Sequence, residues 1–287
     1  MKKSTHPLLQ LLVMLAMSLG VLLLASTVSA ILVLVNGNEM PTTFIMMDEV
    51  VTQLLVFVVP VVLMTFIYYR DNQREYYRLD FSGRKWYYAL AGIVVMLLLI
   101  PFYDMLTEWN DSWNLGRLGE MLRNLQDKTE GIMQMLVGGD SVGRLLANLV
   151  VVALMPAVCE ELFFRAGIQN LIQRWLKNPH AAIWITALIF SLAHGELFSF
   201  MPRFAMGAVL GYLYVYGGSL LPNIVAHFFN NALIVVLYWL SAHGVIDVDP
   251  EAPLHLAGTT IAACTLAALT LFYVVFLMNR KKETIKG

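Results

Sequence analysis

The sequence predicts an all-α polytopic membrane protein with about eight transmembrane helices and both termini in the cytoplasm. Three observations predict this fold class: the composition, a series of long apolar runs, and the distribution of Lys and Arg between the loops. Of the 287 residues, 59% are hydrophobic and only 14% are charged. A globular domain of this length does not bury so large an apolar fraction. We therefore interpret residues 1–287 as a single membrane domain.

Charge and cysteine content argue against two other classes of protein. The formal net charge of −1 at pH 7 offers no excess of basic residues for nucleic acid, so we expect no such partner. Cys159 and Cys264 both lie in apolar runs and predict no disulfide framework. An apolar setting beside a carboxylate also disfavours a thiolate, so Cys159 is not predicted to act as a nucleophile.

The first apolar run extends from Leu8 to Val35 and follows Lys2 and Lys3. This positive start is similar to that of a secretory signal peptide. However, the run is longer than the roughly 7–15 apolar residues of a signal core and continues beyond the small residues at 28–30. We therefore predict a retained transmembrane helix.

Further apolar runs predict seven more membrane helices. Two of them, 181–195 and 203–217, are shorter than the ~20 residues of a full crossing. The eight predicted spans are about 8–35, 50–69, 86–106, 143–166, 181–195, 203–217, 221–241 and 256–279.

The loops alternate in charge along the chain. Residues 70–85, 165–180 and the tail after 279 carry Lys and Arg, whereas 36–49 and 242–255 carry Asp and Glu without Lys or Arg. Because cytoplasmic loops are enriched in Lys and Arg, both termini are predicted to be cytoplasmic. Short loops favour the plasma (inner) membrane, which the chain would cross several times in contact with membrane lipid.

The longest loop, residues 107–141, predicts a helix in the outer membrane interface. Apolar residues from Leu115 to Leu136 follow a spacing of three and four and form one stripe opposite charged residues. Packing of this helix against the bundle or the headgroups is favoured over a role as a substrate gate.

Glu160, Glu161 and Arg165 lie within the apolar run at 143–166. A charge inside the membrane costs at least roughly 2.5–3.5 kcal/mol, so these side chains must face the protein interior or a wet cavity. Glu161 and Arg165 have the spacing of an ion pair on one helix. Pro156 frees a backbone carbonyl one turn earlier and permits a kink ahead of the carboxylates.

Helix spacing brings histidines to the depth of these carboxylates. If residues 143–177 form one helix that turns back near Lys177, then Glu160 and His194 both lie 17 residues from the turn. At about 1.5 Å per residue, both are roughly 25 Å from it. His227 lies about 12 Å beyond the turn near Gly218, and reaches the same layer if 166–177 projects from the membrane.

Three motifs follow one another on these spans. They read Glu160-Glu161-Leu-Phe-Phe-Arg165, Phe190-Ser-Leu-Ala-His194 and His227-Phe-Phe-Asn-Asn231. In this order they resemble the CAAX protease and bacteriocin-processing enzyme family of intramembrane endopeptidases. The resemblance covers about 150–235, which would carry the catalytic core. It implies cleavage of a peptide or prenylated protein substrate in or near the membrane, at a site accessible from the cytoplasm.

The resemblance also implies a role for each motif residue. Glu160 would activate a water molecule for attack on the scissile carbonyl, with assistance from His194. His227 and Asn231 would polarise the carbonyl oxygen, as an oxyanion hole does. Glu161 and Arg165 would position the helix and tune Glu160, and Phe190 is expected to support the site.

Three other hypotheses remain open. Glu160, His194 and His227 are also a suitable ligand set for zinc, so a zinc-dependent intramembrane metalloprotease is an alternative, although metal-independent water activation is favoured. Intramembrane carboxylates and histidines also form proton relays, so a transporter or a peptide-binding immunity protein is a non-enzymatic alternative. Finally, the polar groups could only hold the bundle together, but the convergence of three motifs favours a site.

Overall fold

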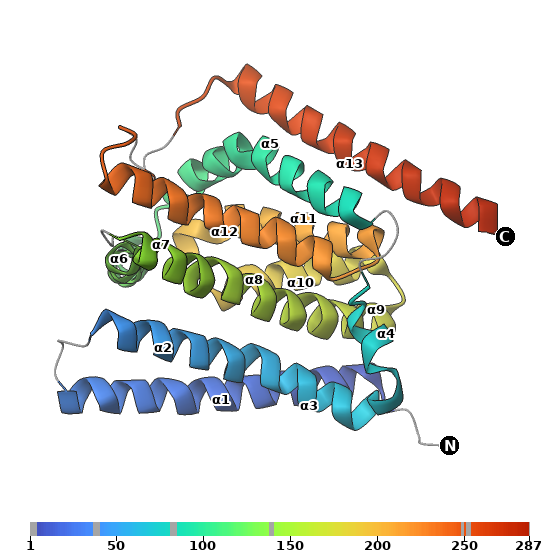
Figure 1. Ribbon diagram of the computed structural model, residues 1–287, viewed down its shortest axis with the longest axis horizontal. Helices are drawn as coiled ribbons and strands as arrows, with labels where there is room; N and C mark the ends of the chain where they lie inside the picture. Colours follow the sequence, from blue (N-terminus) through green and yellow to red (C-terminus); the bar gives the residue numbers. More distant parts are fainter. Residues whose placement is uncertain are drawn as a thin grey trace.

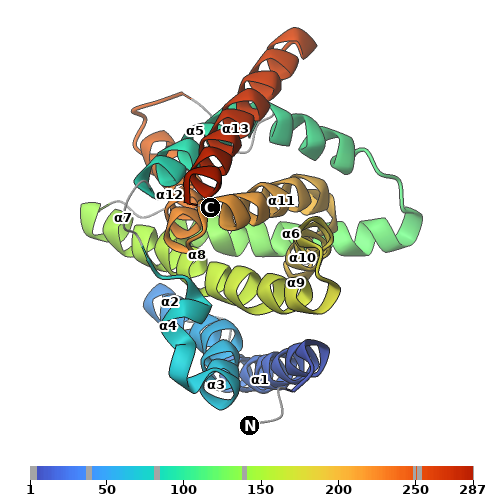
Figure 2. The same cartoon turned by 90° about the vertical axis from the view of Figure 1, so that its right-hand side faces the viewer.

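Long helices that run side by side along one axis make up the protein (Figure 1). The computed structural model describes residues 5–36, 41–80, 85–137, 141–247, 250 and 254–286. Every regular element within those ranges is helical. Viewed along the bundle, α1–α3 form one outer layer, α5 and α13 form the opposite layer, and α8–α12 lie between them (Figure 2).

Six helical segments among the described residues are long and apolar enough to cross a membrane. They are Pro7–Val35, Thr42–Tyr68, Trp86–Asp111, Val142–Leu176, Leu221–Ala242 and Gly258–Val275. Pro179–Ala193 is apolar but shorter. The outer helices keep large apolar side chains exposed, such as Leu34 at 83% and Leu266 at 66%, which suits contact with lipid. The all-α polytopic membrane fold is therefore confirmed, whereas the number of eight spans stays a prediction.

The first outer layer pairs α1 (Pro7–Asn36) with a second helical run that begins earlier than predicted. This run comprises α2 (Thr42–Gln53), a π-helical stretch at Leu54–Val58, and α3 (Val59–Tyr68). The predicted start at residue 50 is wrong because two acidic residues are accommodated inside the helix. Asp48 accepts a hydrogen bond from Ser29 Oγ at 2.9 Å, and Glu49 accepts one from Gln53 Nε2 at 2.7 Å.

After the short α4 (Gln73–Tyr77), α5 (Lys85–Asp111) crosses the bundle and leads to α6 (Gly116–Val137). The helix predicted within 107–141 is therefore present, and α6 lies across the end of the bundle, where Figure 1 shows it end-on. It contacts the loop after α10: the Arg123 guanidinium is 4.0 Å from the Phe198 ring centroid, and Gln126 donates to Ser199 Oγ at 3.3 Å. Its location in a membrane interface stays a prediction.

The central helix is continuous from Val142 to Leu176, as predicted for 143–177. It consists of α7 (Val142–Asn148), a π-helical stretch at Leu149–Leu154, α8 (Met155–Glu160), a second π-helical stretch at Glu161–Gln169, and α9 (Asn170–Leu176). The first π-helical stretch ends just before Pro156. A proline has no N–H and its ring crowds the carbonyl one turn earlier, so a wider turn relieves the crowding. The same combination recurs where Leu54–Val58 precedes Pro60.

Tight turns reverse the chain between the central helices. Lys177 adopts a left-handed conformation with φ of 55°, and the Asn178 side chain accepts the backbone N–H of Ala181 at 3.1 Å to begin α10 (Pro179–Ala193). α11 (Phe200–Gly217) ends at Gly218, which has φ of +62°, and α12 (Leu221–Ala242) follows. The turns predicted near Lys177 and Gly218 are therefore confirmed.

The last helix, α13 (Gly258–Lys286), ends at the same end of the bundle at which α1 begins (Figure 1). This arrangement agrees with the prediction that both termini lie on the same side of the membrane. The cytoplasmic location of that side stays a prediction. Parts of the charged loops used for that prediction, residues 37–40, 81–84, 248–249 and 251–253, lie outside the described residues. The same holds for the side chains from 276 onward.

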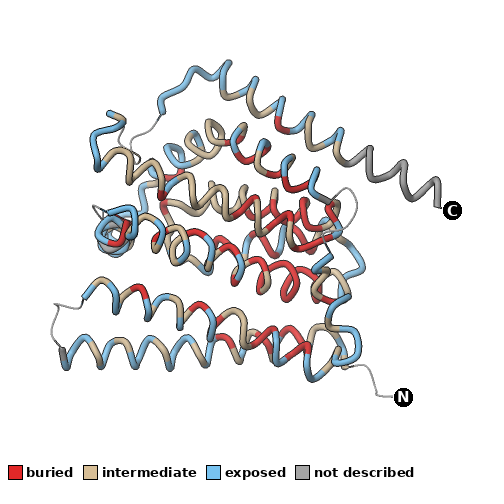
Figure 3. Tube along the Cα trace, in the orientation of Figure 1, coloured by how far each residue is buried: buried red, intermediate tan, exposed pale blue. Residues whose placement is uncertain are grey.

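Buried residues concentrate on the middle layer (Figure 3). Two glycines allow α11 to approach α10 closely there. A Cβ atom on Gly211 would lie 2.8 Å from Ile183 Cγ2, and one on Gly207 would lie 3.2 Å from the Cα atom of Ala187. A larger side chain at either position would push the two helices apart.

Candidate active site

A buried ion pair lies at the centre of the middle layer. The Arg165 Nε atom donates to Glu161 Oε2 at 2.9 Å, and both side chains have 0% exposure. The pair lies at the start of the second π-helical stretch, and its separation of four residues is the one noted in the sequence. Each charge compensates the other in a place where either one unpaired would cost several kcal/mol.

Two residues of α12 bind the same carboxylate. His227 Nδ1 is 3.1 Å from Glu161 Oε1, and Asn223 Nδ2 donates to Glu161 Oε2 at 3.2 Å. Asn223 also donates to the carbonyl of Leu210 on α11 at 2.5 Å. Because a carboxylate accepts hydrogen bonds, His227 carries its proton on Nδ1 when it makes this contact. Glu161 therefore joins the central helix to α12 and fixes the orientation of His227.

Glu160 lies in a different environment from its neighbour. Its Oε2 atom is 3.9 Å from His194 Nε2, and the two side chains keep 12% and 27% exposure. None of the described protein groups donates a hydrogen bond to Glu160 Oε2. The equal depth predicted for Glu160 and His194 is confirmed by this distance. His227, predicted in the same layer, contacts the adjacent carboxylate, Glu161.

Phe190 holds His194 in one orientation. His194 Nδ1 donates to the Phe190 carbonyl at 2.7 Å, so the proton of a neutral ring lies on Nδ1 and the Nε2 lone pair faces Glu160. The fully buried Phe190 ring is 5.3 Å from the Arg165 guanidinium carbon and 6.1 Å from the His227 ring centroid. One aromatic side chain thus packs against all three motifs.

The remaining motif residue, Asn231, lies one turn beyond His227 and is half-buried. Its Oδ1 atom accepts from Asn230 Nδ2 at 3.4 Å, and no other hydrogen bond of Asn231 is found in the described part of the chain. Asn231 therefore has no hydrogen bond to Glu160 or His194 among the described residues. Its predicted role as a donor to the substrate carbonyl stays a prediction.

A second ion pair borders His194. Glu196, which immediately follows the Phe190–His194 motif and Gly195, pairs with Arg203 on α11. The Arg203 Nη1 atom is buried and has no hydrogen-bond partner among the described residues. Its positive charge acts on both Glu160 and His194.

The possible zinc ligands do not form a three-ligand site in this arrangement. Within the described residues, no group of three or more His, Cys, Asp and Glu side chains is placed to hold a metal ion. The contact with Glu161 occupies only Nδ1 of His227, but the 3.9 Å between Glu160 and His194 exceeds the separation of two ligands at about 2.0–2.2 Å from one tetrahedral ion. In the arrangement of the described residues, these groups therefore do not fit a zinc ion.

Asn223 is the main residue of the site that the sequence interpretation missed. It lies one helical turn before His227, and Asn223, His227 and Asn231 share one face of α12. The sequence did contain a signal for this residue, because Asn223 is a polar residue four positions before the intramembrane His227.

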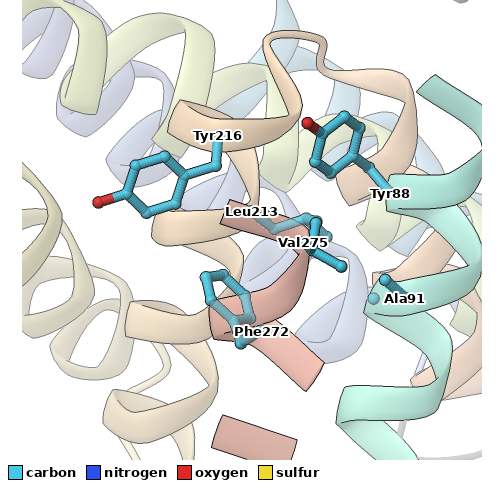
Figure 4. A pocket seen from close by; sticks show the side chains of 7 residues that line it. Tyr88, Ala91, Leu213, Tyr216, Phe272 and Val275 are labelled. Carbon is cyan, nitrogen blue, oxygen red and sulfur yellow. The ribbon is translucent and has the colours of Figure 1, made fainter. Parts of the chain in front are cut away.

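An apolar recess lies apart from the candidate active site, between α5, α11 and α13 (Figure 4). Its lining consists of Tyr88, Ala91, Gly92, Leu213, Tyr216, Phe272 and Val275. None of the motif residues lines it, and it offers no carboxylate or histidine for chemistry.

The fold and the site define a helical membrane protein with a carboxylate–histidine pair inside its bundle. Residues 142–233 match the family model described as Type II CAAX prenyl endopeptidase Rce1-like. This match confirms, over 92 of the 287 residues, the family resemblance indicated by the three motifs. It supports an intramembrane endopeptidase of the CAAX type in general. No curated protein and no solved structure matches the chain.

Proposed function

We propose that this protein is an intramembrane endopeptidase that hydrolyses a peptide bond of a membrane-associated or prenylated substrate. The observation that carries the proposal is the Glu160–His194 pair. It consists of two proton-accepting groups 3.9 Å apart, partly exposed, beside a fully buried ion pair. A water molecule between them can donate one hydrogen to each, which leaves its lone pairs free to attack a carbonyl carbon.

Glu160 is the general base in this proposal because Glu161 is fully engaged. Glu161 accepts hydrogen bonds from Arg165, Asn223 and His227 and is inaccessible. Glu160 has a free oxygen directed at the water position, as far as the described residues extend. Glu160 removes the proton from the attacking water, and His194 Nε2 accepts the second hydrogen bond and orients the water.

His227 and Asn231 stabilise the developing oxyanion. With Nδ1 bound to Glu161, His227 can donate to the carbonyl oxygen through Nε2 only when the ring carries both protons. The Asn231 amide supplies a second donor from the next turn of α12. Glu161 and Arg165 act as positioning residues.

The experiment uses the purified full-length protein in lipid nanodiscs and a panel of prenylated and transmembrane peptides. Wild type is expected to cleave a subset of the panel, and Glu160→Gln and His194→Ala are expected to lose at least a hundredfold in kcat/KM. Glu120→Gln on exposed α6 and His180→Ala at the opposite end of α10 are matched controls, and both should retain wild-type activity.

Two outcomes would contradict the proposal. One is cleavage by Glu160→Gln at the wild-type rate. The other is failure of wild type to cleave any peptide while Glu160→Gln still supports the biological activity of the protein, which would favour peptide binding without hydrolysis. Loss of cleavage with a chelator and its recovery with zinc would replace direct water activation by a metal-dependent mechanism.

A further inference from the structure

A stripe of polar side chains continues from the candidate active site toward the end of the central helix. Glu161, Arg165, Gln169 and Gln173 follow at intervals of four residues, so they lie along one face. The first three are fully buried, and Gln173 is half-buried near the turn at Lys177. An apolar helix face would be expected at this depth in a membrane bundle, so the stripe requires an explanation.

Each residue of the stripe beyond Glu161 has a buried atom without a protein partner. Arg165 Nη1, Gln169 Oε1 and Gln173 Oε1 find none among the residues that the structure describes. Gln169 is nevertheless held in place, since its Nε2 atom donates to the Gly211 carbonyl at 3.0 Å. Its free oxygen is therefore fixed by the fold.

Two tyrosine hydroxyl groups on helices that face the stripe are also buried without a hydrogen-bond partner among the described residues. Tyr214 lies one turn after Gly211 on α11 with 0% exposure, and Tyr76 lies on α4 with 3% exposure. Neither hydroxyl has a hydrogen-bond partner within the described ranges. Burial raises the pKa of Tyr76 well above its ordinary value, so this hydroxyl keeps its proton and needs an acceptor.

Further contacts tie the two tyrosines to the end of the stripe. The Arg174 guanidinium carbon is 5.0 Å from the Tyr76 ring centroid, and the Arg78 guanidinium carbon is 4.9 Å from that of Tyr214. Tyr214 belongs to the same buried cluster as Ala166 of the central helix, and Tyr76 belongs to the cluster that contains Phe164 and Ile168. The free oxygen atoms therefore belong to one region that extends from Glu161 to the Lys177 end of the bundle.

Buried polar atoms in native proteins are almost always hydrogen bonded, either to protein or to internal water. A few isolated exceptions in one chain are ordinary, but several that follow one line through the core require a common partner. Water is the ligand that suits this set, because it can donate to the amide oxygens and accept from the hydroxyl and guanidinium groups.

We propose that a file of internal water molecules occupies the stripe from Arg165 to Gln173 and connects the candidate active site with the bundle end at Lys177. Tyr214 and Tyr76 form its opposite wall. The hydration of the stripe is independent of the proposed function. The delivery of water for hydrolysis rests on that function, since a peptidase inside a membrane consumes one water molecule per peptide bond.

Hydroxyl-radical labelling of the resting protein in nanodiscs tests the hydration directly. Radicals formed from internal water modify the side chains beside it. We expect Tyr214 to be labelled at least threefold faster than Met14 and Met64. The two methionines are equally buried but belong to an apolar cluster that does not contain Tyr214. Labelling of Tyr214 no faster than that of these methionines would overturn the proposal.

Tyr214→Phe provides a second, independent test because it removes only the hydroxyl group. In a dry interior, removal of an unsatisfied hydroxyl raises the thermal midpoint of unfolding. With water bound there, the midpoint falls and the labelling of Tyr76 decreases. A raised midpoint with unchanged labelling would contradict the water file, and this measurement needs no substrate.

The delivery role is tested by cleavage with Gln169→Leu and Gln173→Leu. We expect at least a fivefold lower kcat with an unchanged KM, while Gln53→Leu, a buried glutamine on α2, leaves both parameters unaltered. Unchanged kcat in both stripe variants would remove the delivery role. If wild type cleaves no substrate, the proposed function is contradicted. The hydration of the stripe is then tested by the labelling experiment alone.

Discussion

Glu160 and Glu161 are adjacent in sequence and have opposite environments. The second π-helical stretch begins between them, and Glu161 points into the bundle toward Arg165 while Glu160 faces His194. Glu161 therefore has a structural role, with hydrogen bonds from three neighbouring side chains. Glu160 keeps one oxygen without a hydrogen bond from any described protein group.

This contrast predicts separable effects of two matched substitutions. Glu161→Gln leaves Arg165 without its counter-charge in a place with 0% exposure, so we expect a loss of roughly 3–5 kcal/mol in the free energy of unfolding. Glu160→Gln removes no protein contact of this kind, and its stability should stay within about 0.5 kcal/mol of wild type. Thermal or denaturant unfolding in nanodiscs measures both.

The result that contradicts this prediction is a Glu161→Gln protein as stable as Glu160→Gln. The double variant Glu161→Gln/Arg165→Met serves as the control. Removal of both charges should cost less than the sum of the single substitutions, because neither partner is left unpaired.

At the residue scale, the sequence identified the charged residues and failed to identify their neutral partners. Glu161, Arg165 and His194 stand out because a charge or an imidazole is unusual in an apolar run. Asn223, Gln169 and Tyr214 carry no charge and stand out less, and only the three-dimensional arrangement shows which of their atoms face the site.

At the scale of the elements, the helices were predictable because apolar runs and turn residues mark them. Where the helix bounds differ from the prediction, contacts with other helices are responsible, and these contacts cannot be read from a local sequence pattern. The second helical run starts at Thr42 because Ser29 of another helix binds Asp48. The π-helical stretch at Glu161–Gln169 contains no proline, and no residue within it signals the distortion in the sequence.

Substitution of Pro156 tests whether the π-helical stretch at Leu149–Leu154 determines the orientation of Glu160. Pro156→Ala restores an N–H and permits regular α-helix in place of the π-helical stretch at Leu149–Leu154, so Glu160 should rotate relative to His194. We expect a loss of about tenfold or more in kcat without a loss of stability. Cleavage kinetics and thermal unfolding of the same preparation check both parts.

Pro60→Ala is the matched control, because Pro60 also follows a π-helical stretch but lies on α3, which carries none of the motif residues. It should leave kcat unchanged. Equal losses of activity in the two proline variants would mean that the distortion serves the bundle as a whole.

The packing of α11 against α10 gives a prediction about glycine. A Cβ on Gly211 would meet Ile183 at 2.8 Å and Gln169 Oε1 at 3.0 Å, so Gly211→Ala should destabilise the protein by roughly 1–3 kcal/mol. Gly131→Ala on α6 meets no atom within 4 Å and should be neutral or stabilising by about 0.4–1 kcal/mol. Denaturant unfolding of the two variants compares them, and equal stability would contradict the close approach of the helices.

At the scale of the whole molecule, composition and apolar periodicity predict a membrane bundle because the lipid fixes both the length and the surface of its helices. The layered arrangement was not predictable from these features. α1–α3 and α5 with α13 have similar compositions, and their positions on opposite faces of the middle layer depend on contacts between helices distant in sequence (Figure 2).

The orientation of this bundle in the membrane is the last prediction. Lys and Arg near the turn at Lys177 and in 70–85 predict that this end lies in the cytoplasm and that α6 lies on the outer side. In a variant with Cys159 and Cys264 replaced by Ala, Asn178→Cys and Ser112→Cys introduce single thiols at exposed positions. An impermeant maleimide should label position 112 in intact cells and position 178 only after lysis. The reverse pattern would place the Gln173 end of the stripe outside the cell, and water for the candidate site would then have to enter from the outer surface.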